Sequence, residues 1–343
     1  QHAAVNSSLN PSLTLSPRRR LPEPGEWVER IESGDRQALA TAITVAESRL
    51  PEHRRLIEDL LRRLGPERGH TTRIGITGLP GAGKSTFIEA LGVRLLNKGH
   101  NVAVLAVDPS RVRHQGSILA DKTRMPVLSS HPDAFIRPTP SSGVLGGIAA
   151  ATHESIRLCE AAGFDRILIE TVGVGQSETT VDRVSDVIVL LLIPGAGDEL
   201  QGLKGGILEL ADIVLVNKAD GEGIQAAETT LAEYKAAFHY GSPEHGRRLA
   251  MACSAVTGSG LDTLLERLEA LVATRDAAGE KRARRDRQRL HLLNAQIRRR
   301  LEFDFFTDPE VRSALEKAQL ELERGESDLF TLADRLVKQF KHR

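Results

Sequence analysis

The sequence has few cysteines and no long apolar run, and these two absences narrow the class of protein. Its 343 residues include only two cysteines, Cys159 and Cys253, which show no CxxC or metal-binding spacing. Such sparse use is typical of a reducing compartment, and we expect both thiols to be buried apolar side chains. No uninterrupted apolar stretch reaches the roughly 18 residues that a membrane-spanning helix needs. We therefore expect a protein of a reducing compartment that does not cross a membrane.

Net charge and a secretory signal are also missing. The 46 basic residues balance the 46 acidic residues, so no overall attraction to nucleic acid is expected. The N-terminus is rich in Ser, Pro and Asn and has no apolar stretch long enough for a secretory signal. We interpret residues 1–24 as a disordered lead and expect a cytoplasmic protein. A transit peptide is the alternative, since residues 1–20 contain arginines and no acids.

The sequence pattern changes along the chain from helical to alternating and back to helical. Residues 25–66 place apolar side chains near helical spacing, which predicts an N-terminal helical extension. Short β-rich runs then alternate with segments long enough for crossover helices. The predicted strands are residues 73–77, 102–107, 166–171, 187–193, 213–218 and 251–255. This alternation predicts an α/β domain over residues 67–273, with a mostly parallel sheet covered by helices on both faces.

Beyond residue 273 the predicted strands stop, and residues 274–343 form a helical region. A strongly basic stretch is followed by Leu290, Leu293, Ile297 and Leu301 at helical spacing. Two further apolar stripes follow in the terminal residues. The pattern leaves two interpretations open: a helical appendage that packs on its own sheet domain, or a dimerisation arm whose apolar stripe is buried by a second chain.

The stretch GITGLPGAGKST, residues 75–86, contains the GxxxxGK[ST] pattern between a predicted strand and a predicted helix. Glycines let the backbone curl so that its N–H groups surround an anion, and the N-terminus of the next helix adds partial positive charge. We expect Lys84 to contact the β- and γ-phosphates of a nucleoside triphosphate and Ser85 to bind Mg²⁺. The predicted phosphate-binding residues are Gly78, Leu79, Pro80, Gly81, Ala82, Gly83, Lys84, Ser85 and Thr86.

A second motif, with Asn217, Lys218 and Asp220, stands at the end of the predicted strand 213–218. The Asp220 carboxylate can accept hydrogen bonds from N1–H and the 2-amino group of guanine, whereas adenine would leave it unpaired. Hydrogen bonds to charged groups contribute about 1.5–3 kcal/mol each, so the motif predicts that GTP and GDP bind in preference to adenine nucleotides. The predicted donors of a backbone N–H to the guanine O6 are Ser254, Ala255 and Val256, which follow the last predicted strand.

Two acidic residues end strands on the side of the sheet that carries the phosphate loop. Asp108 ends VAVLAVD and Glu170 ends RILIE, and we expect both to bind Mg²⁺ or its water ligands. The Gly173 N–H is a predicted sensor of the γ-phosphate, so its segment should change conformation when that phosphate leaves. The next residue, Val174, has an apolar side chain that cannot orient an attacking water. We therefore expect slow hydrolysis by the isolated protein and faster hydrolysis with a partner.

The longer motifs resemble those of one family of GTPases. VDPS, GSILADKTRM, FIRPTPSSGVLGG, ETVGVGQSE, GDELQGLKGGILELAD and NKAD all occur in this chain, and the likeness spans residues 25–275. In these motifs the chain resembles the MeaB/ArgK-type GTPases, which are chaperones of adenosylcobalamin-dependent methylmalonyl-CoA mutase and include the methylmalonic aciduria type A protein. The resemblance implies a SIMIBI-type P-loop GTPase fold, a C-terminal arm that forms a homodimer, and a role in protecting the mutase and gating the loading of its cofactor.

The resemblance also implies roles for individual residues. It adds Asp121 of ADKTRM to the metal and hydrolysis site, and it makes Gln201 and Lys204 part of a mobile segment that carries the partner's signal to the nucleotide. The implied catalytic residues are Lys84, Asp121, Glu170, Gln201 and Lys204, and the implied metal ligands are Ser85, Asp108, Asp121 and Glu170.

The chain departs from the family pattern at three places. Residues 111–115 replace small polar residues and glycines with RVRHQ, Ala120 stands where a glycine is usual, and Gly205 stands where a second basic residue often occurs. These positions fall in switch regions, so they bear on coupling to the partner more than on nucleotide binding.

Two other functions use a similar loop. A metallochaperone GTPase for a nickel enzyme would require clustered ligands, which neither the 11 histidines nor the two cysteines form in the sequence. A P-loop kinase would require a second acceptor site and would accept ATP. The client of the leading hypothesis also stays open between methylmalonyl-CoA and isobutyryl-CoA mutases.

Overall fold

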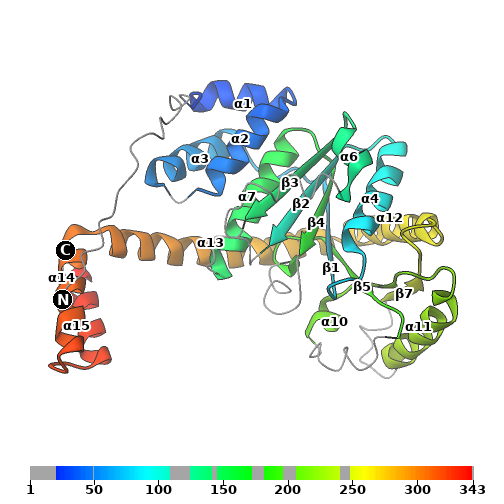
Figure 1. The fold of residues 1–343 in the computed structure, drawn as a ribbon. Coiled ribbons are helices and arrows are strands. Elements are labelled where there is room, and N and C mark those ends of the chain that lie inside the picture. The colour runs from blue at the N-terminus through cyan, green and yellow to red at the C-terminus, as the bar shows by residue number, and fades with distance from the viewer. Residues whose placement is uncertain are drawn as a thin grey trace, which may run out of the picture.

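A parallel seven-stranded sheet forms the centre of the protein (Figure 1). The structure is a computed structural model, and it describes residues 21–48, 50–108, 124–140, 145–171, 181–195, 206–239 and 248–341. The strands are β1 (Thr72–Gly78), β2 (Val102–Asp108), β3 (Ala134–Pro140), β4 (Arg166–Thr171), β5 (Val187–Leu192), β6 (Ile213–Val216) and β7 (Leu249–Ala252). Their order is β3-β2-β4-β1-β5-β6-β7, and every pair is parallel. The predicted fold class is confirmed.

The predicted strands all form, and one further strand was not predicted. β1, β5 and β6 are buried at every position, as expected of apolar strands covered on both faces. The unpredicted strand β3 lies at an edge of the sheet and contains Pro138 and Pro140. Proline is tolerated in a sheet mainly at such edges, but in the sequence it argues against a strand. β6 ends at Val216, so Asn217 and Lys218 follow the strand and are not part of it.

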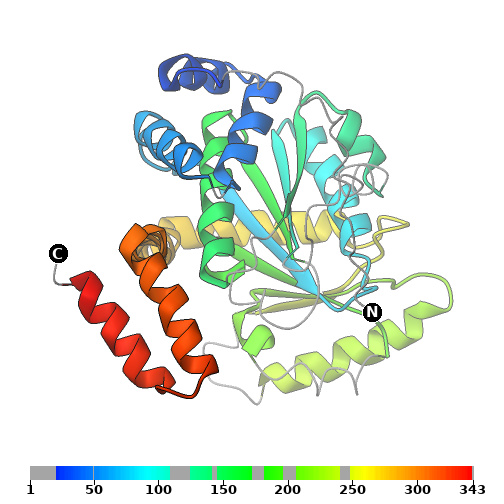
Figure 2. The same cartoon turned by 60° about the vertical axis from the view of Figure 1, so that its left-hand side comes forward.

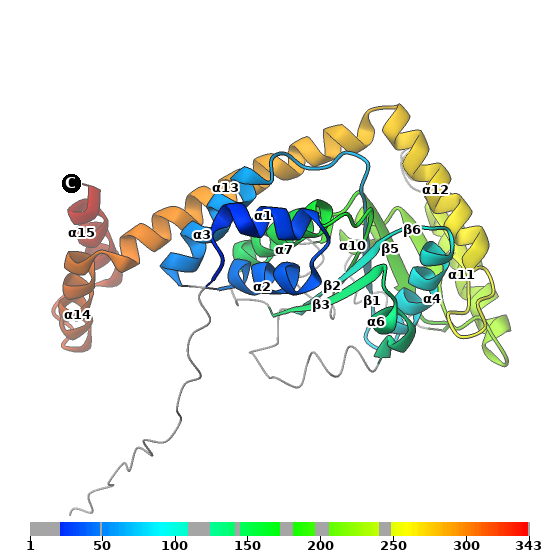
Figure 3. The ribbon, with the colours of Figure 1, turned by 90° about the horizontal axis from the view of Figure 1, so that it is seen from above.

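Helices cover both faces of this sheet, and Figure 3 shows the sheet between the two helical layers. One layer contains α4 (Lys84–Asn97), α6 (Pro126–Ser130) and α12 (Leu261–Ala277); the other contains α7 (Leu145–Ala161), α10 (Gly206–Leu210) and α11 (Gly223–His239). The alternation of side chains along β5 separates the two cores. Val189 and Leu191 pack in the core with α4 and α12, whereas Ile188 and Leu190 belong to cores on the opposite face.

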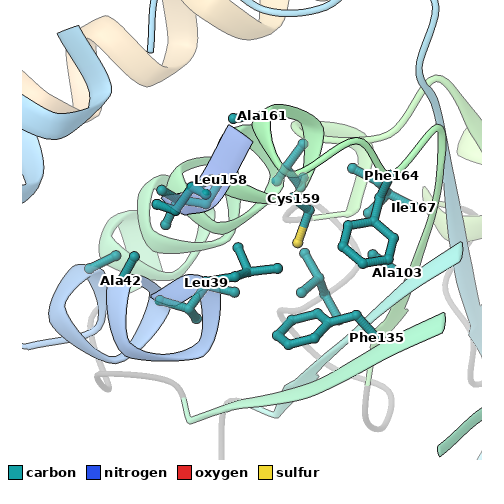
Figure 4. Close-up of a cluster of buried hydrophobic side chains, with 14 of the residues drawn as sticks. Leu39, Ala42, Ala103, Phe135, Leu158, Cys159, Ala161, Phe164 and Ile167 are labelled. Carbon is teal, nitrogen blue, oxygen red and sulfur yellow. The ribbon is translucent and has the colours of Figure 1, made fainter. Parts of the chain in front are cut away.

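The N-terminal helices pack over α7 and the edge strands. These helices are α1 (Pro24–Glu32), α2 (Arg36–Ala46) and α3 (Pro51–Arg63). Leu39 of α2 lies in one buried cluster with Leu158 and Cys159 of α7 and with Phe135 of β3 (Figure 4). The N-terminal extension therefore shares a core with the sheet. Both Cys159 and Cys253 are buried free thiols, as predicted.

The C-terminal helices lead away from the sheet. They are α13 (Glu280–Thr307), α14 (Pro309–Glu323) and α15 (Leu329–Lys341). α13 alone has 28 residues, a length of about 42 Å. Figures 1 and 2 show α14 and α15 side by side at its far end, where Ala318, Leu332 and Leu336 form a small core. No helix in the described ranges is long and apolar enough to cross a bilayer.

The predicted apolar stripe of α13 does not pack on its own sheet domain. Leu290, Leu293, Ile297 and Leu301 are 48–63% exposed in the single chain. The buried side chains of the same helix are mostly polar: Lys281, Arg285, Gln288 and Leu292. The predicted domain boundary at residue 273 falls within α12.

Candidate functional site

The phosphate loop connects the carboxyl end of β1 to the start of α4, near the centre of the sheet. Gly78 ends β1 and Lys84 begins α4. Gly81 and Gly83 have φ angles of 79° and 82°, in the left-handed region. A Cβ atom at Gly83 would lie 2.8 Å from Nδ2 of Asn217, and one at Gly78 would lie 2.3 Å from the carbonyl oxygen of Leu191. The loop therefore requires glycine at positions 78 and 83 for close packing and for the positive φ angle that each adopts.

The Lys84 side chain is buried and lies along the inside of this loop. Its Nζ donates to the carbonyl oxygens of Gly78 and Leu79 at 2.9 and 3.0 Å. Burial lowers the pKa of Lys84, and the nearby negative charge of Glu170 opposes that shift. Because α4 begins at Lys84, the positive end of the helix dipole lies at the same place. The region is thus suited to an anion, which would restore charge balance around the ammonium group.

An acidic residue and a hydroxyl meet beside the loop. Glu170 lies on β4, which pairs with β1, and the Ser85 hydroxyl donates to its Oε1 at 3.1 Å. Glu170 is buried at 7% exposure. Oxygen donors of this kind are the ligands that Mg²⁺ prefers, so Ser85 and Glu170 fit the predicted metal site. Asp108 is the last residue of β2, which pairs with the other side of β4.

The predicted base-recognition motif forms the other end of the candidate site. The Ser254 hydroxyl donates to the Asp220 carboxylate, and the Thr257 N–H donates to the Ser254 Oγ at 3.0 Å. Ser254 is fully buried, so its hydroxyl holds the carboxylate in a fixed place. Lys218 has a φ angle of 62°, the only positive φ among the non-glycine residues that the structure describes. A Cβ at Gly223 would lie 2.5 Å from the Lys218 carbonyl oxygen, so the turn closes on a glycine.

Asn217 joins the two ends of the site. Its Nδ2 donates to the carbonyl oxygen of Ala82 in the phosphate loop at 2.8 Å. Its Oδ1 accepts from the Ala255 N–H at 3.0 Å. The Ala255 N–H, a predicted donor to guanine O6, therefore bonds to Asn217 in this structure, while the neighbouring Val256 is 79% exposed. Asn217 thus fixes the loop of residues 254–260, called the base loop below, relative to the phosphate loop.

The structure brings together only part of the predicted site. Residues 78–86, Glu170, Asn217, Lys218, Asp220 and residues 254–256 are described and lie along the carboxyl ends of β1, β4, β6 and β7. Asp121, Gly173, Gln201 and Lys204 lie outside the described residues, as do Val174, Ala120, Gly205 and residues 111–115. Only the backbone of Asp108 is described.

Sequence reasoning missed one polar contact with the base loop. Arg94 of α4 donates through Nη2 to the carbonyl oxygen of Gly258 at 3.2 Å. The two residues are 164 positions apart, so no local pattern marks the contact.

Comparison with known proteins gives consistent results over most of the chain. A family model described as methylmalonyl Co-A mutase-associated GTPase MeaB matches residues 39–310. A Caulobacter vibrioides protein named as a GTPase is 49% identical over 313 residues, covering 91% of this chain and 96% of its own. GTPase ArgK of Escherichia coli is 43% identical, with 79% of this chain and 82% of its own length aligned.

A mammalian relative and a solved structure extend these similarities. The mitochondrial methylmalonic aciduria type A homolog of Mus musculus is 42% identical, covering 90% of this chain and 78% of its own. A crystal structure of a LAO/AO transport system kinase matches with a TM-score of 0.69 and 33% identity, covering 93% of this chain and 97% of its own. The chain therefore belongs to the MeaB family of methylmalonyl-CoA mutase-associated GTPases.

Proposed function

We propose that this chain is a cytoplasmic GTP-binding and GTP-hydrolysing chaperone of an adenosylcobalamin-dependent acyl-CoA mutase, with methylmalonyl-CoA mutase as the client. It protects the mutase and gates the loading of its cofactor. One observation carries the nucleotide part: Asn217 bonds to both Ala82 and Ala255, which links a phosphate loop to a base loop. Family membership supports the mutase part, because the family model is named for association with that mutase.

The described residues supply distinct parts of nucleotide binding. The loop amides and the N-terminus of α4 bind the phosphates. The Lys84 ammonium exchanges its bonds to the Gly78 and Leu79 carbonyls for bonds to the phosphate oxygens. Mg²⁺, held by Ser85, Asp108, Asp121 and Glu170, would neutralise charge on the phosphates. In the same proposal the Gly173 N–H senses the γ-phosphate, and Gln201 and Lys204 carry the partner's signal to it.

Base selection is tested by exchanging the partner of Asp220. Calorimetry with GDP, XDP and ADP, each with Mg²⁺, should detect GDP binding by the unaltered protein and no comparable ADP binding. Asp220→Asn should weaken the binding of GDP and strengthen the binding of XDP. Xanthine carries a carbonyl in place of the 2-amino group, and the asparagine amide can donate a hydrogen bond to it. Equal binding of ADP and GDP would instead favour a P-loop kinase.

The hydrolysis role of Lys84 is tested with Lys98, the residue that caps the other end of α4, as its control. Lys84→Ala should abolish GTP cleavage while circular dichroism stays unchanged, because Lys84 bonds to two loop carbonyls and the nearby Glu170 carboxylate keeps its hydrogen bond from the Ser85 hydroxyl. Lys98→Ala removes an exposed pair with Glu269 at the other end of α4 and should leave cleavage intact. Unchanged hydrolysis in Lys84→Ala would refute the site assignment.

The partner is tested by adding purified methylmalonyl-CoA mutase. Complex formation should depend on GTP, and single-turnover cleavage should be slow for the isolated chain and faster in the complex. Cleavage at the same rate with and without mutase would contradict the proposed regulation.

Homodimer formation through the C-terminal arm, residues 274–343, belongs to the same proposal. The exposed apolar residues Leu290, Leu293, Ile297 and Leu301 support it, since a stripe of this kind is usually covered. Light scattering should give twice the mass of one chain, and Leu293→Glu should reduce it to one chain. Arg298→Glu, an exposed residue of the same helix outside that stripe, is the matched control.

A further inference from the structure

The side chain of Arg94 links the helix of the phosphate loop to the loop at the base site. Arg94 lies near the C-terminal end of α4, whose first residue is Lys84. Its Nη2 donates to the Gly258 carbonyl at 3.2 Å, its Nε donates to Asp262 Oδ1 at 2.8 Å, and its Nη1 donates to the Ala90 carbonyl at 3.1 Å. One planar guanidinium group is thereby fixed by three acceptors, one on α4, one in the loop that precedes α12 and one on α12.

Gly258 is shaped to receive this guanidinium. Its φ angle is 84°, and a Cβ added there would lie 2.5 Å from Nη2 of Arg94. The Gly258 N–H donates to the Ser254 carbonyl at 2.9 Å, and the Ser254 N–H donates to the Ser259 carbonyl at 3.0 Å. Arg94 therefore contacts a tight turn that closes back on Ser254, the residue whose hydroxyl bonds to Asp220.

We propose that Arg94 is a positioning residue for guanine recognition. It holds the base loop, residues 254–260, against α4 and so keeps Ser254 and Asp220 at a fixed separation from the phosphate loop. Asn217 fixes the near side of the loop through Ala255, and Arg94 fixes its far side through Gly258. Two separate contacts set both the position and the tilt of the loop. The inference rests on the proposed function, in which Asp220 binds guanine.

The expected effect is on base affinity and not on the chemical step. The Arg94 guanidinium donates a charge-assisted hydrogen bond to Gly258 from a partly exposed side chain, so Arg94→Ala should weaken GDP binding about 3- to 10-fold. KM for GTP should rise by a similar factor, while kcat at saturating GTP stays unchanged, because Arg94 does not reach the phosphates. The ratio of GDP affinity to IDP affinity should fall. IDP lacks the 2-amino group of guanine, and in the proposal this group contacts only Asp220, which Ser254 holds in place.

Three variants separate positioning from stability. Arg94→Lys keeps the charge but lacks the planar fork, and should give an intermediate affinity. Gly258→Ala should displace the guanidinium and so weaken GDP binding. In a protein that already carries Arg94→Ala, the added Gly258→Ala should weaken GDP binding less than Gly258→Ala does in the unaltered protein. Lys98→Ala removes the Lys98–Glu269 pair at 2.8 Å, which joins α4 and α12 without touching the base loop, and should leave GDP and IDP binding unchanged.

The experiment is titration of the full chain with GDP, IDP and inorganic tripolyphosphate, followed by steady-state GTP hydrolysis. Failure of the unaltered protein to bind GDP would refute the proposed function itself. If the unaltered protein binds GDP and Arg94→Ala matches Lys98→Ala, the positioning role is overturned. An equal loss for GDP, IDP and tripolyphosphate would also overturn it, because the defect would then lie at the phosphate loop.

Discussion

Replacing Arg285 should destabilise the protein far more than replacing any exposed arginine of the same helix. Arg285 lies in the second turn of α13, and its guanidinium binds both carboxylate oxygens of Asp186, at 2.7 and 2.6 Å. It also donates to the carbonyl oxygen of Thr71 at 2.7 Å, next to the start of β1. Both partners of the ion pair are buried, at 5% and 2% side-chain exposure.

The magnitude follows from what the substitution leaves behind. Arg285→Met removes the cation and leaves the Asp186 carboxylate buried, with the Arg73 N–H at 2.9 Å as a remaining donor. Breaking a buried pair in this way costs about 3–5 kcal/mol in the free energy of unfolding. Adding Asp186→Asn should recover part of that loss, because a neutral amide oxygen still accepts from the Arg73 N–H.

The assay is urea unfolding followed by tryptophan fluorescence and by far-UV circular dichroism. Trp27 is the only tryptophan and is fully buried, so it reports on one core. Arg289→Met is the control: its pair with Asp286 is more than half exposed and contributes about 0–1 kcal/mol. Equal urea midpoints for Arg285→Met and Arg289→Met would refute the reasoning that buried polar contacts hold the first turns of α13 against the sheet.

Two further predictions concern the N-terminal extension and acid stability. Leu39→Ala, at a fully buried position, should cost about 2–5 kcal/mol and shift the fluorescence and dichroism transitions together, whereas separate transitions would show that α1–α3 unfold independently. Burial acts to raise the pKa of Glu67, but its bond to His153 and the charge of Arg73 hold it well below the usual 4.5. A depressed carboxyl pKa contributes stability above 4.5 that is lost as pH falls, so Glu67→Gln should flatten the loss of stability on acidification below that pH.

The sheet and the phosphate loop could be predicted because their signals are local. A buried parallel strand is a continuous apolar run, and the phosphate loop packs its glycines and its lysine into a few consecutive positions. β3 gave no such signal, because Arg137, Pro138 and Pro140 interrupt it and an edge position tolerates them. The burial of the N-terminal helices against α7 also depends on contacts between distant segments, which periodicity alone does not specify.

The site was predictable by residue type and less so by contact. The motif NKAD predicts that Asn217 and Asp220 belong to the base site, yet spacing does not reveal that Asn217 bonds to Ala82. Ser254 and Ala255 were predicted as donors to the base, and in the structure they hold Asp220 and Asn217. Side chains that position other side chains are hard to predict, because their partners come from other elements.

The apolar pattern of α13 identified the helix but not the face that contacts the body. Apolar side chains normally mark the buried face, and here Leu290, Leu293 and Ile297 are exposed while Arg285 and Gln288 are buried. The reason is that α13 packs against the N-terminal ends of the strands and the loops that precede them, which present carbonyl oxygens and carboxylates. Gln288 donates to the carbonyl oxygens of Asp182 and Ser185 at 2.7 and 2.8 Å. The polar face of α13 therefore packs against the body, where its side chains find hydrogen-bond partners. The apolar face is exposed in the single chain and would contact the second chain of the homodimer that we propose.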